Sequence, residues 1–237
     1  MNKIIKNIPN CITSLNLGAG CLSIIAASYA TAPFWGLRGF QWAFIFMAMA
    51  AVADFLDGFA ARLFKAYSEL GKQLDSLCDL VSFGVAPGLT LFFLLRDIAV
   101  DPWLCWTALL IPVSAAFRLG RFNLDTRQTV NFIGMPVPAN AMFWIGYAAL
   151  MWRGVEFLSL WYVFLPFLVV ECWLMNSNIP MFSLKMTSFS LRENLPRYLL
   201  VLAAGLFCFS LGVAGLFWLI VFYVLCGIAF MRRSKKD

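Results

Sequence analysis

Four aspartates stand inside or at the ends of two neighbouring apolar segments, and their spacing suits metal chemistry. They are Asp54, Asp57, Asp75 and Asp79. The first two are three residues apart and the last two are four apart, so each pair shares one face of a helix. A carboxylate at membrane depth costs about 3 kcal/mol or more, so it usually has a functional partner. Four converging carboxylates would repel one another, so we expect them to hold Mg²⁺ or Mn²⁺, which prefer oxygen ligands.

The residues alone leave two other interpretations of these aspartates open. An aspartate in a membrane helix can serve only as a hydrogen-bonding partner for another helix, which accounts for one residue better than for two spaced pairs. Carboxylates also line the ion and proton pathways of transporters. A carboxylate-gated cation transporter is therefore the alternative from a different functional class.

The segments that carry these aspartates belong to a very apolar chain. Hydrophobic residues make up 62% of the 237 residues and charged residues 13%, against about half and about a quarter in soluble domains. Apolar stretches separated by short polar connections predict one all-α polytopic membrane domain, residues 1–237, with about eight helices. The expected spans are 12–31, 41–62, 73–95, 103–121, 135–152, 157–175, 197–212 and 214–231.

The distribution of charge predicts the orientation of these spans. The chain has 18 Lys and Arg and 12 Asp and Glu, which gives a net charge of +6. Eight spans put both termini on one side, and only Arg38, Arg96 and Arg153 of the 18 cations fall on the other. The positive-inside rule therefore predicts cytoplasmic termini and cytoplasmic aspartates in an inner membrane. The basic balance is then a topology signal with some attraction to membrane lipids, and nucleic-acid binding is not expected.

Both ends of the chain are basic. Residues 1–10 carry two lysines beside isoleucines on one helical face, which suits a short interfacial helix on the membrane as well as a flexible tail. Residues 232–237 are expected to form a basic cytoplasmic tail.

The composition excludes several kinds of catalysis. Histidine is absent, so Ser–His and Cys–His pairs, histidine proton shuttles and histidine-ligated zinc are excluded. The seven cysteines include no CxxC pair, which predicts single buried thiols in place of a disulfide framework or metal cluster. A general base in this chain must therefore be sought among the carboxylates.

The residues around the aspartates complete a longer pattern. From Asp54 the chain reads D-F-L-D-G-F-A-A-R, followed by eight residues to Gly71, three to Asp75 and three to Asp79. This resembles the signature of the CDP-alcohol phosphatidyltransferases, D-x2-D-G-x2-A-R-x8-G-x3-D-x3-D, with every fixed position matched. The resemblance implies a six-helix core followed by two C-terminal helices, and a homodimer.

The resemblance also implies roles for the matching aspartates. Asp54, Asp57 and Asp75 would coordinate the metal, and Asp79 would reach it in some members and act as general base toward an acceptor hydroxyl. The alcohol would attack the phosphorus of CDP-diacylglycerol that is nearer the lipid, with CMP as leaving group. Two divalent ions about 4 Å apart would neutralise the pyrophosphate and stabilise the departing phosphate.

Small and cationic residues of the signature suit a nucleotide site. Gly58 and Ala61 leave room for a flat group or a pyrophosphate beside the helix backbone. Arg62 offers a planar fork of donors to phosphate oxygens. Gly71 is expected to let the second aspartate helix begin close to the first.

The start of the first span carries a second pattern, P-N-C-I-T-S-L-N over residues 9–16. It is similar to the entrance P-N-x2-T-x2-N of the same family, whose first helix lines the cytidine site. Asn10, Thr13 and Asn16 would then bind the CDP-diacylglycerol headgroup. Capping of a helix N-terminus by Asn10 or Thr13 is the alternative.

Three downstream segments bear on the acceptor alcohol. F-R-L-G-R-F-N ends the fourth span, F-I-G-M-P-V-P-A opens the fifth, and N-S-N-I-P follows the sixth. Together they resemble the integral-membrane phosphatidylserine synthases within the family, although Gly120 and Asn140 depart from the usual small residues. L-serine is then the expected acceptor, and its candidate ligands are Arg118, Arg121, Asn123 and Lys185.

Alternatives remain for the acceptor side. Arg118 and Arg121 could only anchor the end of their span, and Glu171 in the sixth span could be a helix–helix hydrogen-bonding partner or part of an acceptor site. Glycerol phosphate or an inositol phosphate is the alternative acceptor, although each would need a more basic pocket.

Overall fold

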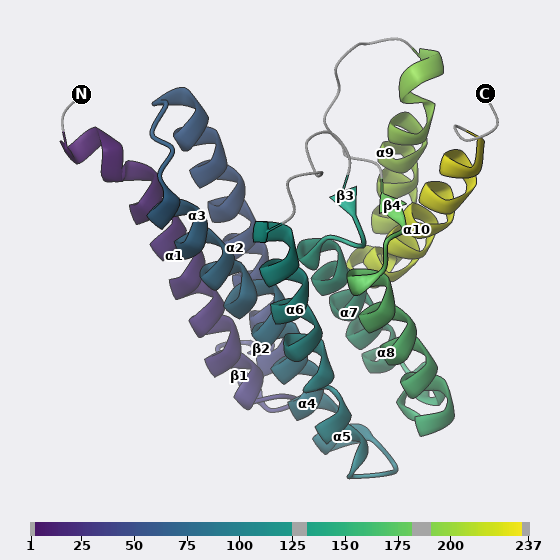
Figure 1. Cartoon of the computed structure of the whole chain (residues 1–237). Helices are drawn as coiled ribbons and strands as arrows, with labels where there is room; N and C mark the ends of the chain where they lie inside the picture. Colours follow the sequence, from purple (N-terminus) through teal and green to yellow (C-terminus); the bar gives the residue numbers. More distant parts are fainter. Residues whose placement is uncertain (1–2, 125–131, 182–190, 234–237) are drawn as a thin grey trace. The chain divides into compact units, whose positions relative to one another are not determined.

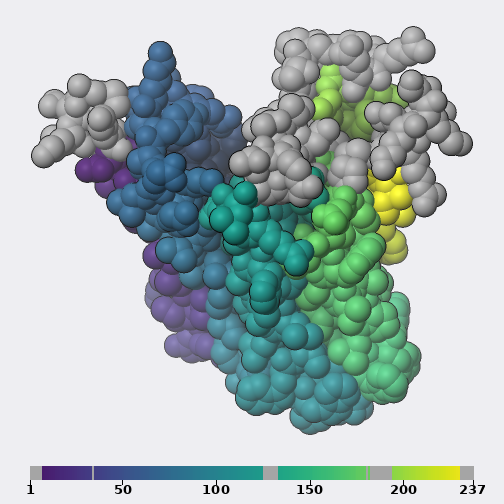
Figure 2. Space-filling view, in the orientation of Figure 1, coloured from purple at the N-terminus to yellow at the C-terminus, as the bar shows by residue number. Residues whose placement is uncertain are grey.

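The computed structural model describes residues 3–124, 132–181 and 191–233, which are almost entirely helical (Figure 1). The chain divides into two compact units, Met1–Leu119 and Gly120–Asp237. Within each unit, side chains fill the space between the helix ribbons (Figure 2). The single domain expected over residues 1–237 stays a prediction, and the two units are described in turn.

The first unit is built around its N-terminal helix. Its elements are α1 (Lys3–Ser28), β1 (Pro33–Phe34), β2 (Leu37–Arg38), α2 (Gly39–Leu63), α3 (Glu69–Asp79), the π-helix η1 (Leu80–Val85), α4 (Ala86–Ile98), α5 (Leu104–Thr107) and α6 (Leu110–Leu124), which continues past Leu119. β1 and β2 pair as an antiparallel hairpin that reverses the chain between α1 and α2. Helix α1 packs along α2 and also contacts α3, η1 and α4.

The second unit has an aromatic core. Its elements are β3 (Phe132–Ile133), α7 (Val137–Trp152), η2 (Glu156–Ser159), α8 (Trp161–Asn176), β4 (Pro180–Met181), α9 (Leu191–Leu211), η3 (Gly212–Ala214) and α10 (Gly215–Arg233). Rings from α7, α8 and α10 pack within 6.1 Å of one another, from Phe143, Tyr147, Phe167 and Phe217. Gly146 lets the backbone of α10 approach α7 at Phe217, where a Cβ would collide.

The apolar helices confirm a membrane protein of the all-α class. Among the described residues, Asn7–Ser28, Gly39–Leu63, Glu69–Ile98 and Asn194–Ala229 are long and apolar enough to cross a membrane, and Trp161–Asn176 is apolar but shorter. Asn194–Ala229 contains a reversal at η3, where Gly212 has a φ of 54° and Gly215 lies against the Phe207 carbonyl. The expected total of about eight spans stays a prediction.

Three sequence-based boundaries were wrong. The first helix begins at Lys3, so residues 3–10 continue α1 and are not a flexible tail. The third begins at Glu69, because Ser68 caps it by accepting a hydrogen bond from the Gly71 amide. The expected span 103–121 is split between α5 and α6, because Pro112 has no amide hydrogen to continue one helix across the junction.

The cysteines are free, as expected, but they are not all buried. Cys78, Cys105 and Cys226 are buried, whereas Cys11 and Cys21 are exposed on the outer face of α1. The helix therefore presents these two thiols away from its packed side, which the absence of a CxxC pair could not indicate.

A polar network ties the hairpin end of the first unit to α4. The Asp97 carboxylate accepts hydrogen bonds from the Thr31 hydroxyl (3.1 Å) and from Arg96 Nε (3.0 Å). Arg38 Nη1 donates to the Thr31 carbonyl at 2.7 Å. Asp97 thus links the turn after α1 to the last turn of α4.

We expect Asp97→Ala to lower the free energy of unfolding by about 1 kcal/mol, because an exposed charge-assisted network contributes modestly. Unfolding of the detergent-solubilised protein, followed by circular dichroism, measures the change. The matched control is Asp101→Ala, since the Asp101 side chain makes no hydrogen bond or ion pair within the described residues. Equal stability of the two variants would contradict a role for the network.

Candidate metal centre and active site

The helices that carry the aspartate pairs are held together by α1 more than by each other. A reversal at residues 64–68, with Lys65 at a φ of 50°, sends the chain from α2 into α3. Helix α3 then packs chiefly against α1, which also packs along most of α2. The sequence predicts direct antiparallel neighbours, whereas in the structure α1 is their common support.

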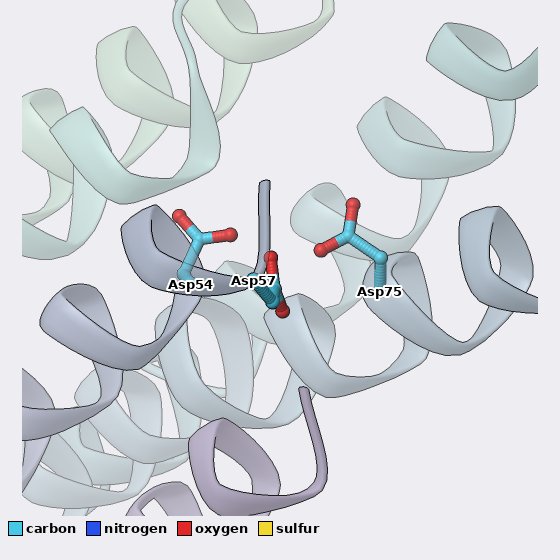
Figure 3. Close-up of side chains that lie close together, drawn as sticks. All are labelled: Asp54, Asp57 and Asp75. Atoms are coloured by element: carbon cyan, nitrogen blue, oxygen red, sulfur yellow. The ribbon is translucent and has the colours of Figure 1, made fainter. Parts of the chain in front are cut away.

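Three of the four aspartates converge. One carboxylate oxygen from each of Asp54, Asp57 and Asp75 lies within 4.8 Å of the other two. Asp54 and Asp57 come from α2 and Asp75 from α3, and Asp57 stands between the other two (Figure 3). Asp57 is 6% exposed, and its Oδ2 has no hydrogen-bond partner in the described part of the chain.

The donor set of this triad fits a divalent cation. Three carboxylates this close repel one another unless positive charge lies between them. All donors are oxygens, which Mg²⁺ and Mn²⁺ prefer, and the unpartnered Oδ2 of Asp57 is a free ligand atom. The residues present therefore fit the metal that the sequence predicts.

Asp79 has different surroundings from the triad. It ends α3, one turn beyond Asp75, where η1 begins. Its Oδ1 accepts a hydrogen bond of 3.2 Å from Asn16 Nδ2 on α1. Asp79 remains within electrostatic reach of the three other carboxylates.

The polar residues of α1 face the signature residues. The Thr13 hydroxyl donates to the Pro9 carbonyl at 3.0 Å, and the side chain lies beside Asp57. Asn10 Oδ1 lies 3.1 Å from the position that a Cβ on Gly71 would occupy. Because α1 begins at Lys3, Asn10 and Thr13 lie inside the helix, and the alternative that they cap its N-terminus was wrong.

The small residues of the signature have two different environments. A Cβ on Gly58 would meet nothing within 4 Å, so space is open beside α2 at this point. Ala61 is half-buried, and Arg62 is exposed with its Nε donating to the Gly58 carbonyl at 2.9 Å. Gly71 approaches Asn10 of α1 and its own cap Ser68, so our expectation that it permits close approach to α2 was wrong.

The acceptor candidates are divided between the units. Arg118 is 5% exposed in the first unit, one turn beyond Ala115, which contacts η1 at Gly84. Arg121 and Asn123 belong to the second unit, where Arg121 Nη1 donates to the Asn176 carbonyl at 3.1 Å. Lys185 lies outside the described residues.

Two features of the site are not apparent in the sequence. The Ser82 hydroxyl in η1 donates to the backbone carbonyl of Asn16 at 3.0 Å, and a Cβ on Gly20 would collide with it. The pair of small residues, one on each helix, is the only sequence signal for this contact. Glu171 is buried in α8, and its Oε2 has no hydrogen-bond partner among the residues described, so neither of its predicted roles is decided.

The fold and the carboxylate triad together define a helical membrane protein with a candidate divalent-cation site. Residues 6–175 match the CDP-alcohol phosphatidyltransferase family. This match covers most of the sequence and includes the whole aspartate signature, so the chain belongs to that family.

Several relatives are similar over much of their length. The CDP-diacylglycerol–serine O-phosphatidyltransferase of Mycobacterium leprae is 33% identical over 97% of this chain and 75% of the relative. Proteins of the same name from Helicobacter pylori and Bacillus subtilis are 33% and 35% identical, over 82% and 57% of this chain and 78% and 71% of the relative.

We expect Asp57→Asn to weaken Mn²⁺ binding by at least roughly tenfold, because the change removes the buried ligand of the triad. The loss of the free Mn²⁺ electron paramagnetic resonance signal on titration measures binding in detergent. Glu69→Gln is the matched control, since Glu69 is an exposed acid in the first turn of α3. Unchanged Mn²⁺ affinity in Asp57→Asn would remove the triad as the metal site.

Proposed function

We propose that this protein transfers the phosphatidyl group of CDP-diacylglycerol to the hydroxyl of L-serine, giving phosphatidylserine and CMP in phospholipid biosynthesis. The observation that carries the proposal is the aspartate triad, built from a complete family signature. The chain around it is 33% identical over nearly its whole length to a protein named for this activity. The enzyme is then a CDP-diacylglycerol–serine O-phosphatidyltransferase.

Asp54, Asp57 and Asp75 would hold two divalent ions, Mg²⁺ or Mn²⁺, and their convergence supports this role. Such ions, when bound, neutralise pyrophosphate charge and stabilise the leaving CMP phosphate. Arg62 would bind the phosphates, because its Nε is engaged by Gly58 and its terminal nitrogens point outward from an exposed position.

The remaining signature and α1 residues would form the nucleotide site. The open space at Gly58 supports close approach of the pyrophosphate to α2. These residues are Asn10, Thr13, Asn16, Asp54, Gly58, Ala61, Arg62 and Gly71.

Asp79 would act as the general base. It would take the proton of the serine hydroxyl while the serine oxygen forms a bond to the lipid-side phosphorus and the bond from that phosphorus to the CMP oxygen breaks. The absence of histidine supports a carboxylate in this role. The hydrogen bond from Asn16 to Oδ1 leaves Oδ2 as the oxygen for the serine proton.

Arg118 is the candidate best supported for the serine carboxylate. It is a buried cation on the helix that packs against η1, the segment that begins directly after Asp79. A guanidinium can bind a carboxylate through two parallel hydrogen bonds. Arg121, Asn123 and Lys185 are the further candidates for contacts to serine.

The placement of charge supports an orientation in which both termini and the aspartates face the cytoplasm across an inner membrane. Cations outnumber acids by 18 to 12, and all but three fall on one side if eight spans are present. The lipid tails of the substrate would enter from the membrane between helices, and the protein would act as a homodimer.

The acceptor is tested by offering the purified enzyme CDP-diacylglycerol and Mn²⁺ with serine, glycerol phosphate or inositol phosphate in turn. We expect CMP release that requires serine and is at least roughly tenfold slower with either phosphate, because a second phosphate adds charge to a site with one buried cation. CMP release with a phosphate acceptor alone would replace serine as substrate. Metal flux into protein-containing liposomes without CMP release would instead favour the cation transporter.

We expect Asp79→Asn to lower kcat by roughly 10²- to 10⁴-fold, because an amide cannot accept the serine proton. Binding of CDP-diacylglycerol, measured by equilibrium dialysis with labelled substrate, should change by less than about threefold, since the amide keeps the size of the carboxylate. The control Asp101→Asn makes the same change on a connection outside the site. An Asp79→Asn enzyme with more than about a tenth of the normal kcat would exclude Asp79 as the base.

A further inference from the structure

A fully buried amide connects α1 to the end of α3. Asn16 is 0% exposed, and its Nδ2 donates to Asp79 Oδ1 at 3.2 Å. Its Oδ1 has no hydrogen-bond partner within the described part of the chain. A buried amide is stabilised by partners for both of its ends, so a donor held on a carboxylate while the acceptor is left free indicates a position fixed for more than packing.

The backbone of Asn16 is held as firmly as its side chain. The Ser82 hydroxyl donates to the Asn16 carbonyl at 3.0 Å, and Ser82 is also 0% exposed. Gly20, one turn further along α1, has no Cβ, and any Cβ there would collide with Ser82 Oγ and lie 3.0 Å from its Cα. Helix α1 therefore rests directly on η1 at the level of Asp79.

The π-helix extends this arrangement to Asp79. Residues 80–85 form η1 between α3 and α4, so the wide turn begins immediately after Asp79 and includes Ser82. Asp79 and Ser82 both meet Asn16, one at its side chain and the other at its carbonyl. Asn16 is thereby bonded at two points to one short segment, which restricts both its own position and the rotation of the carboxylate.

We propose that Asn16 is a positioning residue for Asp79, and that Ser82 and Gly20 hold Asn16 in place for this task. The proposal rests on the proposed function, in which Asp79 removes the serine proton. By fixing Oδ1, the Asn16 amide directs Oδ2 toward the acceptor hydroxyl. It also holds the carboxylate away from a fully shared position with Asp54, Asp57 and Asp75.

This role differs from the nucleotide-binding role that the sequence predicts for Asn16, and two substitutions separate them. Asn16→Ala removes both ends of the amide. Asn16→Asp keeps an oxygen where Oδ1 stands but loses the N–H that reaches Asp79, so a nucleotide contact through Oδ1 survives it and the positioning contact does not. Each variant is assayed for serine-dependent CMP release, for the KM of both substrates and for Mn²⁺ binding.

We expect both Asn16 variants to lower kcat by roughly 10- to 100-fold, because each loses a hydrogen bond to a charged group. The KM for CDP-diacylglycerol and for serine should stay within about threefold of the wild-type values, and Asn16→Ala should bind Mn²⁺ normally. Ser82→Ala should lower kcat by a few-fold, since it acts on Asp79 only through Asn16.

Ser23→Ala is the matched control for Ser82→Ala. The Ser23 hydroxyl is also 0% exposed and donates from α1 to a backbone carbonyl of a neighbouring helix, that of Ala43 at 2.9 Å, but it does not contact Asp79. Its loss should leave kcat unchanged. If Asn16→Ala does not accumulate as folded protein, Asn16→Asp, which preserves the side-chain volume, decides the question.

Three results would overturn the proposal. They are a kcat within about twofold of wild type in Asn16→Asp, a raised KM for CDP-diacylglycerol with kcat unchanged in Asn16→Ala, and equal kcat losses in Ser23→Ala and Ser82→Ala. Wild-type enzyme that releases no CMP with serine would instead contradict the proposed function, so failure of that function is distinguished from failure of the positioning role.

Discussion

Repulsion between carboxylates is the constraint on which the first unit depends. Asp54, Asp57 and Asp75 place oxygens within 4.8 Å of one another, and Asp79 lies within electrostatic reach of all three. In apolar surroundings this repulsion is weakly screened, so the two helices that carry these residues would separate without support from elsewhere. The support comes from α1, which packs against both helices over a long distance.

Helix α1 serves two purposes because its faces differ in chemistry. Near the middle of the bundle its small residues let neighbouring helices approach, as at Gly20 against Ser82, and the Ser23 hydroxyl bonds the α2 carbonyl of Ala43. Membrane helices associate through such close packing and interhelical hydrogen bonds, because lipid offers no hydrophobic gain for contact between them. The same helix turns Thr13 and Asn16 toward the aspartates, so its packing and its chemistry are inseparable.

The metal triad could be predicted from the sequence because the relevant information is local. Spacings of three and four residues place each aspartate pair on one helix face, and a short connection brings α2 and α3 together. The role of α1 could not be predicted in this way, since periodicity identifies a buried face but not the helix that covers it. The π-helix at 80–85 and the break before α6 depend on packing around Ser82 and on Pro112, respectively, and neither changes the apolar pattern.

The separation of Asp79 from the triad follows from what a base must do. A carboxylate oxygen bound to a cation has its electron pairs engaged and its negative charge offset, so it is a poor acceptor for a proton. Metal binding and proton transfer therefore require carboxylates in different surroundings, even when they lie a single helical turn apart. The chain meets this requirement with one amide, because the bond from Asn16 gives Asp79 a neutral hydrogen-bonding partner that the triad residues lack among the residues described. A helix that first stabilises the repelling carboxylates thus also makes one of them chemically different from the others.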